Sequence, residues 1–335
     1  MPSPSSIRPF FRYAALITAV SVGAMLAAMA IVAAAIALGG PRDLPPLASI
    51  NEPFKDRVQT DVPPAQRYTA RDGTVLAWHA YGPAGSTASV PLRRVVLLHG
   101  SSARGESNHV LAQALAAEGY AVASLDMRGH GASGPRGRAA YIGQLEDDLE
   151  DFLRSVPHTG PQTLMGFSAG GGFALRFAAS SRQELFSDYV LLSPFLHHEA
   201  PTSRPDSGGW AFVGIPRMIA LTLLNRLGIT GLNDLPVMSF ALSEAAGNVL
   251  TPSYSYTVAS NFRPHDDYQA DIRRARGKIC IVAGQADELF YADRFASVFA
   301  DAGKTVPVTL LPGIDHINLI LDAAAVRVIA QSCQT

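Results

Sequence analysis

One serine of the chain lies in a setting that suits nucleophilic chemistry, the pentapeptide Gly166-Phe167-Ser168-Ala169-Gly170. This run fits the pattern G-x-S-x-G, in which a serine occupies a sharp turn between a strand and a helix. An apolar run ends just before it, and a stretch with helical spacing follows. We expect Gly166 and Gly170 to let the backbone pass closely on either side, forming a nucleophile elbow. Ser168 is therefore interpreted as a nucleophile with its hydroxyl exposed above a sheet.

A serine hydroxyl needs a base to take its proton, and the base needs a third group to orient it. On strand–turn–helix elbows of this kind the partners follow later strands, in the order serine, acid, histidine. Asp287 follows the apolar run 278–283, and His316 follows the run 306–311. Both therefore lie where loops leave the carboxyl ends of strands. The sequence predicts a triad of Ser168, Asp287 and His316, with Glu288 and then Asp315 as rival acids.

Attack on a carbonyl creates an oxyanion, which needs two backbone N–H donors. One donor is expected from Ala169, the residue after the nucleophile. The other is expected from His99-Gly100-Ser101-Ser102, the loop that follows the apolar run 94–98. We assign this second donor to Ser101, with Ser102 as the alternative.

The surrounding chain alternates between short apolar runs and helical stretches. Buried strands are expected at 94–98, 121–125, 163–166, 189–193, 278–283 and 306–311, and helices at 110–118, 145–156 and 169–179. Such alternation predicts a mostly parallel sheet with helices on both faces. An Asp-Gly turn at 72–73 joins two further strands, which are antiparallel. The predicted fold class is α/β, with one core domain formed by residues 65–194 and 266–335.

Between residues 195 and 265 this alternation fails. The stretch is too long for a structureless loop inside a compact domain, and 217–227 is amphipathic. We interpret it as a cap or lid inserted over the carboxyl edge of the sheet. The alternative is a small second domain with no role in the site.

The N-terminal part is dominated by an uncharged run from Ala14 to Leu38. The run exceeds the roughly 20 residues that a helix needs to cross a bilayer, so residues 14–38 are predicted to be a transmembrane signal anchor. Arg8 and Arg12 precede it, which places residues 1–13 in the cytoplasm as a short stub and the core domain on the other side of the membrane. Residues 39–64 are a Pro-rich tether. The competing interpretation is a cleaved signal peptide and a secreted protein.

Composition excludes some classes of partner. The net charge is −1, so no basic field would attract nucleic acid. The chain has two cysteines, Cys280 and Cys333, which could pair outside the cytoplasm. No Cys/His cluster has convincing metal spacing, and His197-His198-Glu199 indicates a solvated loop. The acidic run at 146–151 is interpreted as a solvated helix face.

Taken together, these residues resemble the α/β-hydrolase superfamily, and within it the monoacylglycerol lipase-like and lysophospholipase-like serine hydrolases. The likeness spans about residues 68–330. It is carried by the 99–102 loop, Asp126-Met127-Arg128-Gly129-His130-Gly131-Ala132-Ser133, Gly166–Gly170, Gly284–Asp287 and Asp315-His316. The resemblance implies transfer of an acyl group to water from a small apolar ester or lipid, without a cofactor. It also implies that the 128–131 turn is structural and shapes a wall of the pocket.

Other activities use the same machinery. Peptidases, thioesterases and C–C bond hydrolases share this triad, because function depends on the pocket and not on the fold. A non-catalytic, membrane-tethered binding protein is the alternative from a different class. The presence of all three triad residue types favours catalysis.

Overall fold

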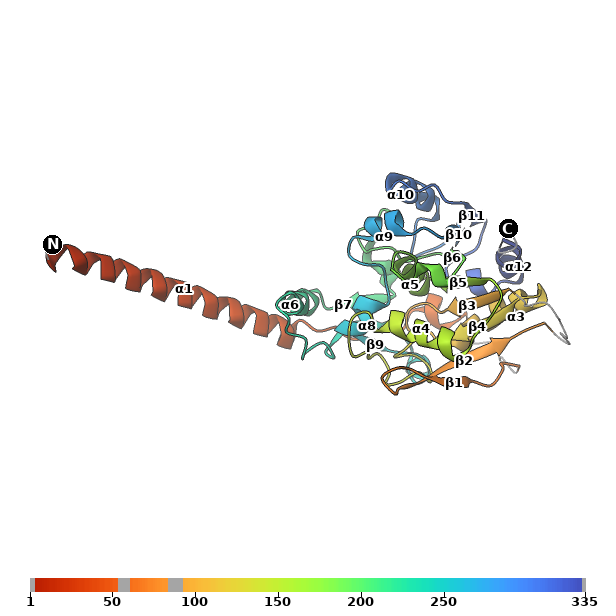
Figure 1. Ribbon diagram of the computed structural model, residues 1–335, viewed down its shortest axis with the longest axis horizontal. Helices are drawn as coiled ribbons and strands as arrows, with labels where there is room; N and C mark the ends of the chain where they lie inside the picture. Colours follow the sequence, from red (N-terminus) through yellow and green to blue (C-terminus); the bar gives the residue numbers. More distant parts are fainter. Residues whose placement is uncertain (1–3, 54–60, 84–92, 333–335) are drawn as a thin grey trace.

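An eight-stranded sheet forms the centre of the protein, whose computed structural model describes residues 4–53, 61–83 and 93–332 (Figure 1). Its strand order is β1-β2-β4-β3-β5-β6-β10-β11. β2 pairs antiparallel with β1 and β4, and every later pair is parallel. The strands are β1 Gln66–Thr69, β2 Val75–Tyr81, β3 Arg94–Leu98, β4 Ala121–Leu125, β5 Gln162–Phe167, β6 Asp188–Leu192, β10 Lys278–Gly284 and β11 Val308–Leu311. The predicted α/β fold is confirmed.

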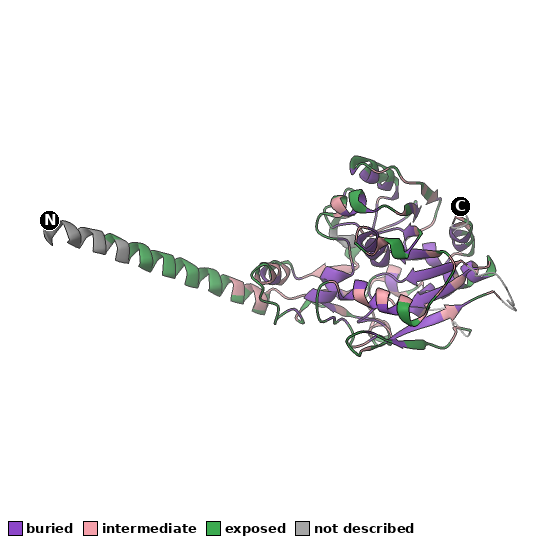
Figure 2. Cartoon of the chain, viewed as in Figure 1, coloured by how far each residue is buried: buried purple, intermediate pink, exposed green. Residues whose placement is uncertain are grey.

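Helices cover both faces of this sheet. Buried side chains of α4 (Gln144–Ser155), α5 (Ala169–Ala178), α9 (Tyr268–Arg274) and α10 (Phe295–Asp301) share one core. Those of α3 (His109–Ala117), α11 (Asn318–Leu321) and α12 (Ala323–Ser332) form a second core with the other face. Figure 2 shows the sheet buried between these layers. The strands read as continuous apolar runs because both of their faces are covered.

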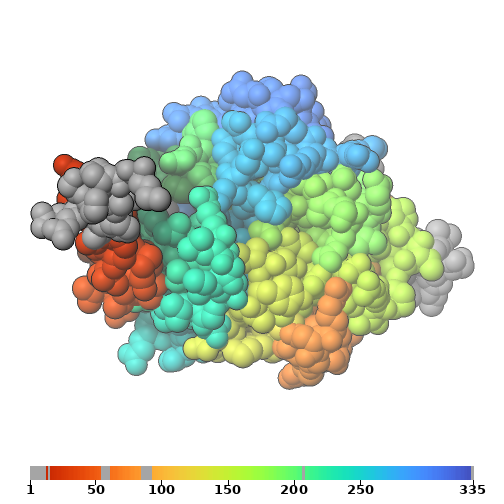
Figure 3. Space-filling model, turned by 60° about the vertical axis from the view of Figure 1, so that its left-hand side comes forward, coloured from red at the N-terminus to blue at the C-terminus, as the bar shows by residue number. Residues whose placement is uncertain are grey.

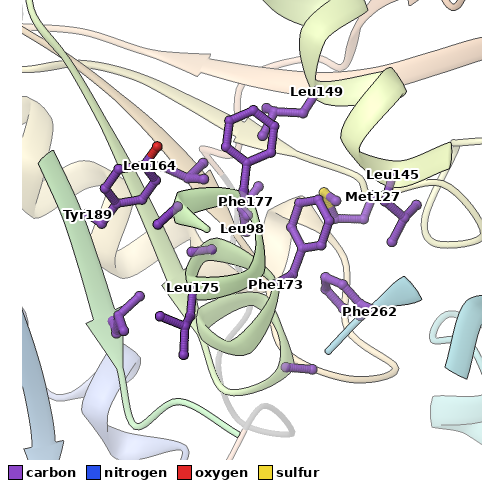
Figure 4. Close-up of a cluster of buried hydrophobic side chains, with 14 of the residues drawn as sticks. Leu98, Met127, Leu145, Leu149, Leu164, Phe173, Leu175, Phe177, Tyr189 and Phe262 are labelled. Atoms are coloured by element: carbon purple, nitrogen blue, oxygen red, sulfur yellow. The ribbon is translucent and has the colours of Figure 1, made fainter. Parts of the chain in front are cut away.

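Helix α5 is buried along its whole length. Phe173 and Phe177 project from it into a cluster with side chains of the sheet, of α4 and of the later chain (Figure 4). Truncating such a buried phenylalanine to alanine typically costs about 3–5 kcal/mol. Because α5 begins at the residue after Ser168, this packing holds the turn that carries the serine. The neighbours drawn in Figure 4 include Leu98, Met127, Leu145, Leu149, Leu164, Tyr189 and Phe262.

Between β6 and β10 the chain forms a second, smaller sheet of order β7-β8-β9, which is antiparallel. We call residues 195–265 the inserted segment. Its elements are β7 Ala211–Val213, α6 Ile215–Arg226, β8 Pro236–Phe240, α7 Glu244–Gly247, β9 Ser253–Ser255 and α8 Tyr256–Asn261. The amphipathic stretch expected at 217–227 corresponds to α6. The segment therefore has ordered elements of its own.

Helix α1 (Pro4–Leu38) projects from the rest of the molecule (Figure 1). Its part from Leu16 to Leu38 is long and apolar enough to cross a membrane, and none of that part is buried. The chain that follows is bound to the inserted segment. The Leu47 backbone N–H and the Asn51 side-chain amide both donate to the carbonyl oxygen of Ala241, at 3.0 Å each. Leu47 precedes the short helix α2 (Ala48–Asn51), and Asn51 ends it.

The acidic run on α4 corrects the sequence interpretation. Its carboxylates do not form a solvated face, because arginines from distant parts of the chain pair with them. The Arg176 guanidinium lies 2.6 Å from Glu146, and the Arg128 guanidinium lies 2.7 Å from Asp148, with all four side chains largely buried. Arg71 binds Asp151 through two nitrogens. The run therefore attaches α4 to the core by ion pairs.

Cys280 lies in β10 and is unpaired among the described residues. Burial raises the pKa of its thiol to about 11. Cys333, the partner considered from the sequence, lies outside the described residues, so that pairing stays a prediction.

Candidate active site

Ser168 lies on a strained turn between β5 and α5. Its backbone has φ 54° and ψ −117°, a conformation that residues other than glycine rarely adopt. The turn is held from both sides: the Ser168 N–H donates to the Leu192 carbonyl at 2.8 Å, and its own carbonyl accepts from Gly172 and Phe195 at 3.0 Å. These bonds to the next strand end offset the strain and fix where the hydroxyl lies.

The two elbow glycines are needed for close backbone approach. A Cβ on Gly166 would lie 2.6 Å from the Gly171 nitrogen and closer still to the Gly170 carbonyl. A Cβ on Gly170 would lie 2.9 Å from the Leu98 carbonyl oxygen and would also strike the His99 oxygen. Because the obstacles are backbone atoms, they cannot rotate away. A side chain at Gly166 or Gly170 would therefore force the backbone of the turn to move.

His316 and Asp287 lie together in the loops that follow β11 and β10. The imidazole Nδ1 is 2.8 Å from the Asp287 Oδ2, and both side chains are buried. The other carboxylate oxygen accepts the backbone N–H groups of Leu289 and Phe290 at 2.9 Å. Burial by itself would raise the pKa of Asp287, but the charge and hydrogen bond of His316 and these backbone donors together lower that pKa below its ordinary value. Asp287 is therefore an ionised acceptor that orients the ring.

The rival acids have other partners. Glu288 Oε2 accepts the backbone N–H of His316 at 3.0 Å, so it holds the main chain of the histidine and not its ring. Asp315 accepts the backbone and side-chain N–H groups of Asn318 at 2.8 and 2.9 Å, at the start of α11. Of the three acids considered from the sequence, Asp287 is the one on the imidazole.

Ser168 and His316 line one large cavity of about 1660 Å³. The serine hydroxyl and the imidazole are not hydrogen bonded to one another in the described chain. Such bonds between nucleophile and base often tighten only when substrate binds. Three rings surround His316: Phe167, Phe290 and Trp210 have centroids 4.7, 5.3 and 5.4 Å from that of the imidazole. Trp210 belongs to the inserted segment, so that segment forms part of the site.

The candidate oxyanion donors face the same cavity. Ala169 is the first residue of α5, so its N–H has no acceptor within the helix. Ser101 also lines the cavity. The alternative, Ser102, has φ 64°, and its N–H donates to the Tyr254 hydroxyl at 2.5 Å. That amide is therefore occupied, which favours Ser101 as the second donor.

Behind this loop lies a buried pair of histidines, His99 and His130. The Tyr254 hydroxyl lies 2.6 Å from His130 Nε2, and the His99 and His130 rings are 4.7 Å apart. Burial lowers the pKa of His130 well below its ordinary value, and the neighbouring His99 lowers it further. A neutral His130 accepts the Tyr254 proton at Nε2 and donates from Nδ1 to the Arg128 carbonyl at 3.2 Å. The 128–131 turn is thus joined to the 99–102 loop through Tyr254.

A second cluster lines the cavity at His197, His198 and Glu199. One ligand atom from each lies within 4.8 Å of the others, although the triplet was interpreted as a solvated loop. His198 and Glu199 are exposed, but His197 is buried and accepts the Glu199 backbone N–H at Nδ1, 3.2 Å away. Because His197 Nδ1 already accepts this hydrogen bond, it is not free to bind a metal ion, and we assign no metal to the cluster.

Comparison with known proteins agrees with this fold. Residues 89–319 match the Hydrolase_4 family, described as serine aminopeptidase, S33. A monoacylglycerol lipase of Mycolicibacterium smegmatis is 37% identical over 106 residues, which cover 30% of this chain and 37% of that protein. The chain thus matches little more than a third of the length of this curated relative.

Two solved structures extend the comparison. A soluble variant of monoglyceride lipase from Saccharomyces cerevisiae, in complex with a substrate analog, has a TM-score of 0.60 at 18% identity, covering 84% of this chain and 97% of that one. A bacterial membrane phospholipase A has a TM-score of 0.53 at 16% identity, covering 98% of this chain and 97% of that one. At these identities the likeness shows the fold alone. The family match covers well over half of the sequence, and the chain belongs to the Hydrolase_4 (serine aminopeptidase, S33) family of α/β-hydrolases, with monoacylglycerol lipase-like relatives.

Proposed function

We propose that the protein is a serine hydrolase that cleaves carboxylic esters through an acyl-enzyme on Ser168. The observation that carries this proposal is the buried 2.8 Å bond between His316 Nδ1 and Asp287, beside a cavity that Ser168 also lines. That bond fixes the tautomer in which Nε2 is free to accept a proton. A merely structural histidine would not need an ionised, fully buried partner next to a strained serine.

In the proposed reaction His316 takes the Ser168 proton as Oγ attacks the ester carbonyl. The Ser101 and Ala169 amides stabilise the oxyanion of the tetrahedral intermediate. His316 then gives its proton to the leaving alcohol, and the acyl group stays on Oγ. A water molecule, deprotonated in turn by His316, attacks the acyl-enzyme and releases the carboxylic acid. Asp287 stays ionised throughout and stabilises the imidazolium.

For the substrate we propose a lipid-like ester of the monoacylglycerol or lysophospholipid type. The cavity of about 1660 Å³ exceeds the roughly 300–1,000 Å³ of pockets for drug-sized ligands, which suits an acyl chain. Apolar side chains from the inserted segment, such as Met218 and Phe240, line it. Support also comes from relatives named as a monoacylglycerol lipase and a membrane phospholipase A.

For location we propose a single-pass protein, anchored by α1 with its N-terminus in the cytoplasm and the hydrolase domain on the other side. The apolar, unburied stretch Leu16–Leu38 supports the anchor. A topology reporter fused after Pro64 tests the orientation. Recovery of a shortened protein from the medium would instead support signal cleavage and secretion.

Labelling and a substrate panel test the proposed activity. An active-site-directed fluorophosphonate should label the wild type and fail to label Ser168→Ala. The purified enzyme should hydrolyse p-nitrophenyl esters and acyl-glycerols faster than aminoacyl arylamides. No labelling of the wild type, or equal labelling of both proteins, would count against catalysis by Ser168 and favour the non-catalytic, binding alternative. Cleavage of the arylamide alone would favour the peptidase alternative. The description of the family as serine aminopeptidase is the reason for including the arylamide.

A further inference from the structure

One face of α6 is apolar and exposed. Ile215, Ile219 and Leu223 follow one another at intervals of four residues, with 54%, 63% and 46% of their surfaces exposed, and Leu227 continues the row at 69%. Residues spaced by four lie on one side of a helix. Leu221, on the opposite side, is fully buried, and Ala220 beside the row is buried as well. Isolated exposed aliphatic residues are common on proteins, but a continuous row along a helix marks a surface that something covers.

The same helix binds the end of α1. The Arg217 guanidinium donates from Nε to the Ile36 carbonyl at 2.7 Å and from Nη2 to the Ala37 carbonyl at 3.2 Å. Carbonyls in the last turn of a helix have no partner within it, and a cation there is also favoured by the helix dipole. The third nitrogen, Nη1, donates to the Pro236 carbonyl at 2.8 Å, in the inserted segment. Two of these hydrogen bonds therefore join Arg217 to α1, and the third holds its side chain within the inserted segment.

Glycines let the two backbones meet directly. A Cβ on Gly39 would lie 2.7 Å from the Pro216 Cβ, and a Cβ on Gly214 would lie 2.5 Å from the Gly39 carbonyl oxygen. The Arg217 N–H also donates to that oxygen, at 3.3 Å. The connection between α1 and α6 is thus closely packed, so the position of α1 determines the position of α6. Figure 3 shows the teal surface of this segment next to the red surface of α1 and the chain that follows it.

The junction also sets the depth of α6. Ile36 and Ala37 lie inside the stretch Leu16–Leu38, which is apolar enough to span a membrane. A helix bound at this level overlaps the last turn of the span, which corresponds to about 5 Å along its axis. Helices in the membrane interface bury their apolar faces by about 5–10 Å. If α1 crosses the bilayer, the exposed row of α6 is therefore at the height of the lipid acyl chains.

We propose that α1 and α6 form one membrane-docking unit, in which Arg217 fixes the junction and the row Ile215–Leu227 is immersed in the lipid bilayer. This inference rests on the proposed membrane anchor and deepens the proposed function. Ile215 and Ile219 of the row also line the cavity that contains Ser168. The docked helix therefore holds one wall of that cavity against the bilayer, so an amphiphilic ester reaches Ser168 from the lipid phase along α6.

The first test separates docking from catalysis. Leu223 and Leu227 belong to the row and do not line the cavity. Full-length Leu223→Asp/Leu227→Asp protein in phosphatidylcholine nanodiscs should hydrolyse bilayer-embedded monoacylglycerol roughly tenfold more slowly than wild type, because charge is disfavoured in lipid. Its turnover of a water-soluble butyrate ester should stay unchanged. Leu185→Asp is the matched control, since Leu185 is 38% exposed and lies before β6, away from α1.

Equal losses on both substrates, or no loss on either, would overturn the docking proposal. If the wild type neither hydrolyses the soluble ester nor reacts with the fluorophosphonate, the proposed function itself is rejected. The two failures are therefore distinguishable.

The second test locates the row directly. A tryptophan introduced as Leu223→Trp should be quenched by brominated lipids in nanodiscs, whereas Leu185→Trp should add fluorescence that is not quenched. If position 223 is quenched no more than position 185, lipid does not cover the row. If it is unquenched and cross-links to a second copy of the chain, the row is a dimer interface and the proposal is wrong.

The third test addresses the junction. Arg217→Ala should reduce turnover of the bilayer-embedded substrate several-fold and leave the soluble ester unaffected. Arg226→Ala, a change on the same helix at an exposed position, should affect neither substrate. Matching behaviour of the two variants would show that Arg217 does not hold the docking unit together.

Discussion

The backbone N–H of Ser102 donates to the Tyr254 hydroxyl over 2.5 Å, joining two residues that are 152 positions apart. A second link lies beside it, because the Ser102 carbonyl accepts from the Thr251 N–H and the Ser102 hydroxyl donates to the Thr251 carbonyl, at 2.8 and 2.7 Å. The inserted segment thus holds the loop that carries the proposed oxyanion donor Ser101. The 99–102 loop is thus held in place by hydrogen bonds with the inserted segment.

Replacing Tyr254 by phenylalanine tests this dependence. The change removes the acceptor of the Ser102 N–H and the donor to His130 while keeping the ring. We expect kcat to fall about tenfold with KM little changed, because a displaced donor weakens binding of the transition state more than binding of the ester. Steady-state kinetics on a soluble ester measure the split. A rise in KM at constant kcat would show that Tyr254 shapes the pocket instead.

The two neighbouring acids allow a matched comparison. Asp287→Asn should lower kcat by up to about 10⁴, because the amide no longer favours the required tautomer of His316. Glu288→Gln should cost far less, since Glu288 binds the His316 backbone N–H, which an amide oxygen can still accept. Kinetics of both variants, with thermal unfolding to check folding, provide the measurement. Comparable losses in the two variants would reject Asp287 as the orienting acid.

Much of the fold was accessible from sequence because its signals are local. The strand expected at 94–98 is β3, and the run 278–283 differs from β10 by one residue, since each is a short apolar run bounded by turns. The candidate triad followed from order along the chain, because parallel strands bring their carboxyl ends to one edge of the sheet. The sheet topology fixes these positions, and the alternation of strands and helices in the sequence predicts that topology.

What sequence reasoning missed depends on pairing between distant residues. We interpreted the acids on α4 as solvated because their neighbours in the sequence give no sign of their ion pairs. Their partners Arg71, Arg128 and Arg176 come from distant parts of the chain. The preference for Ser101 over Ser102 had no contact to support it for the same reason, since Tyr254 lies in a part of the chain without a readable pattern. The docking of Arg217 on α1 spans 181 positions. Such contacts specify one packing among many that suit the same local pattern.

Buried His130 should make stability depend on pH. The unfolded chain takes up a proton at this histidine as the pH falls below about 6.5, whereas the folded protein does so only at lower pH, because its pKa is depressed. The folded state then binds fewer protons, so stability is full above that value and declines as the pH falls. Melting temperatures between pH 8 and pH 5 should fall less steeply for His130→Asn than for the wild type. Parallel curves would contradict this assignment.

The elbow glycines give the sharpest test of local geometry. A methyl group at position 170 would meet the backbone carbonyls of Leu98 and His99, which belong to the central strand β3 and the start of the 99–102 loop. Gly170→Ala must therefore shift β3, α5 or the serine turn, and we expect at least a hundredfold loss of kcat, because positioning errors of about 1 Å cost that much. Gly82→Ala is the matched control, since a Cβ there meets nothing within 4 Å and the backbone needs no positive φ. Kinetics of both variants, together with fluorophosphonate labelling rates, distinguish a displaced nucleophile from a general loss of folding. Full activity in Gly170→Ala would mean that the turn relaxes without moving Ser168, and that the close approach of β3 is not what positions the nucleophile.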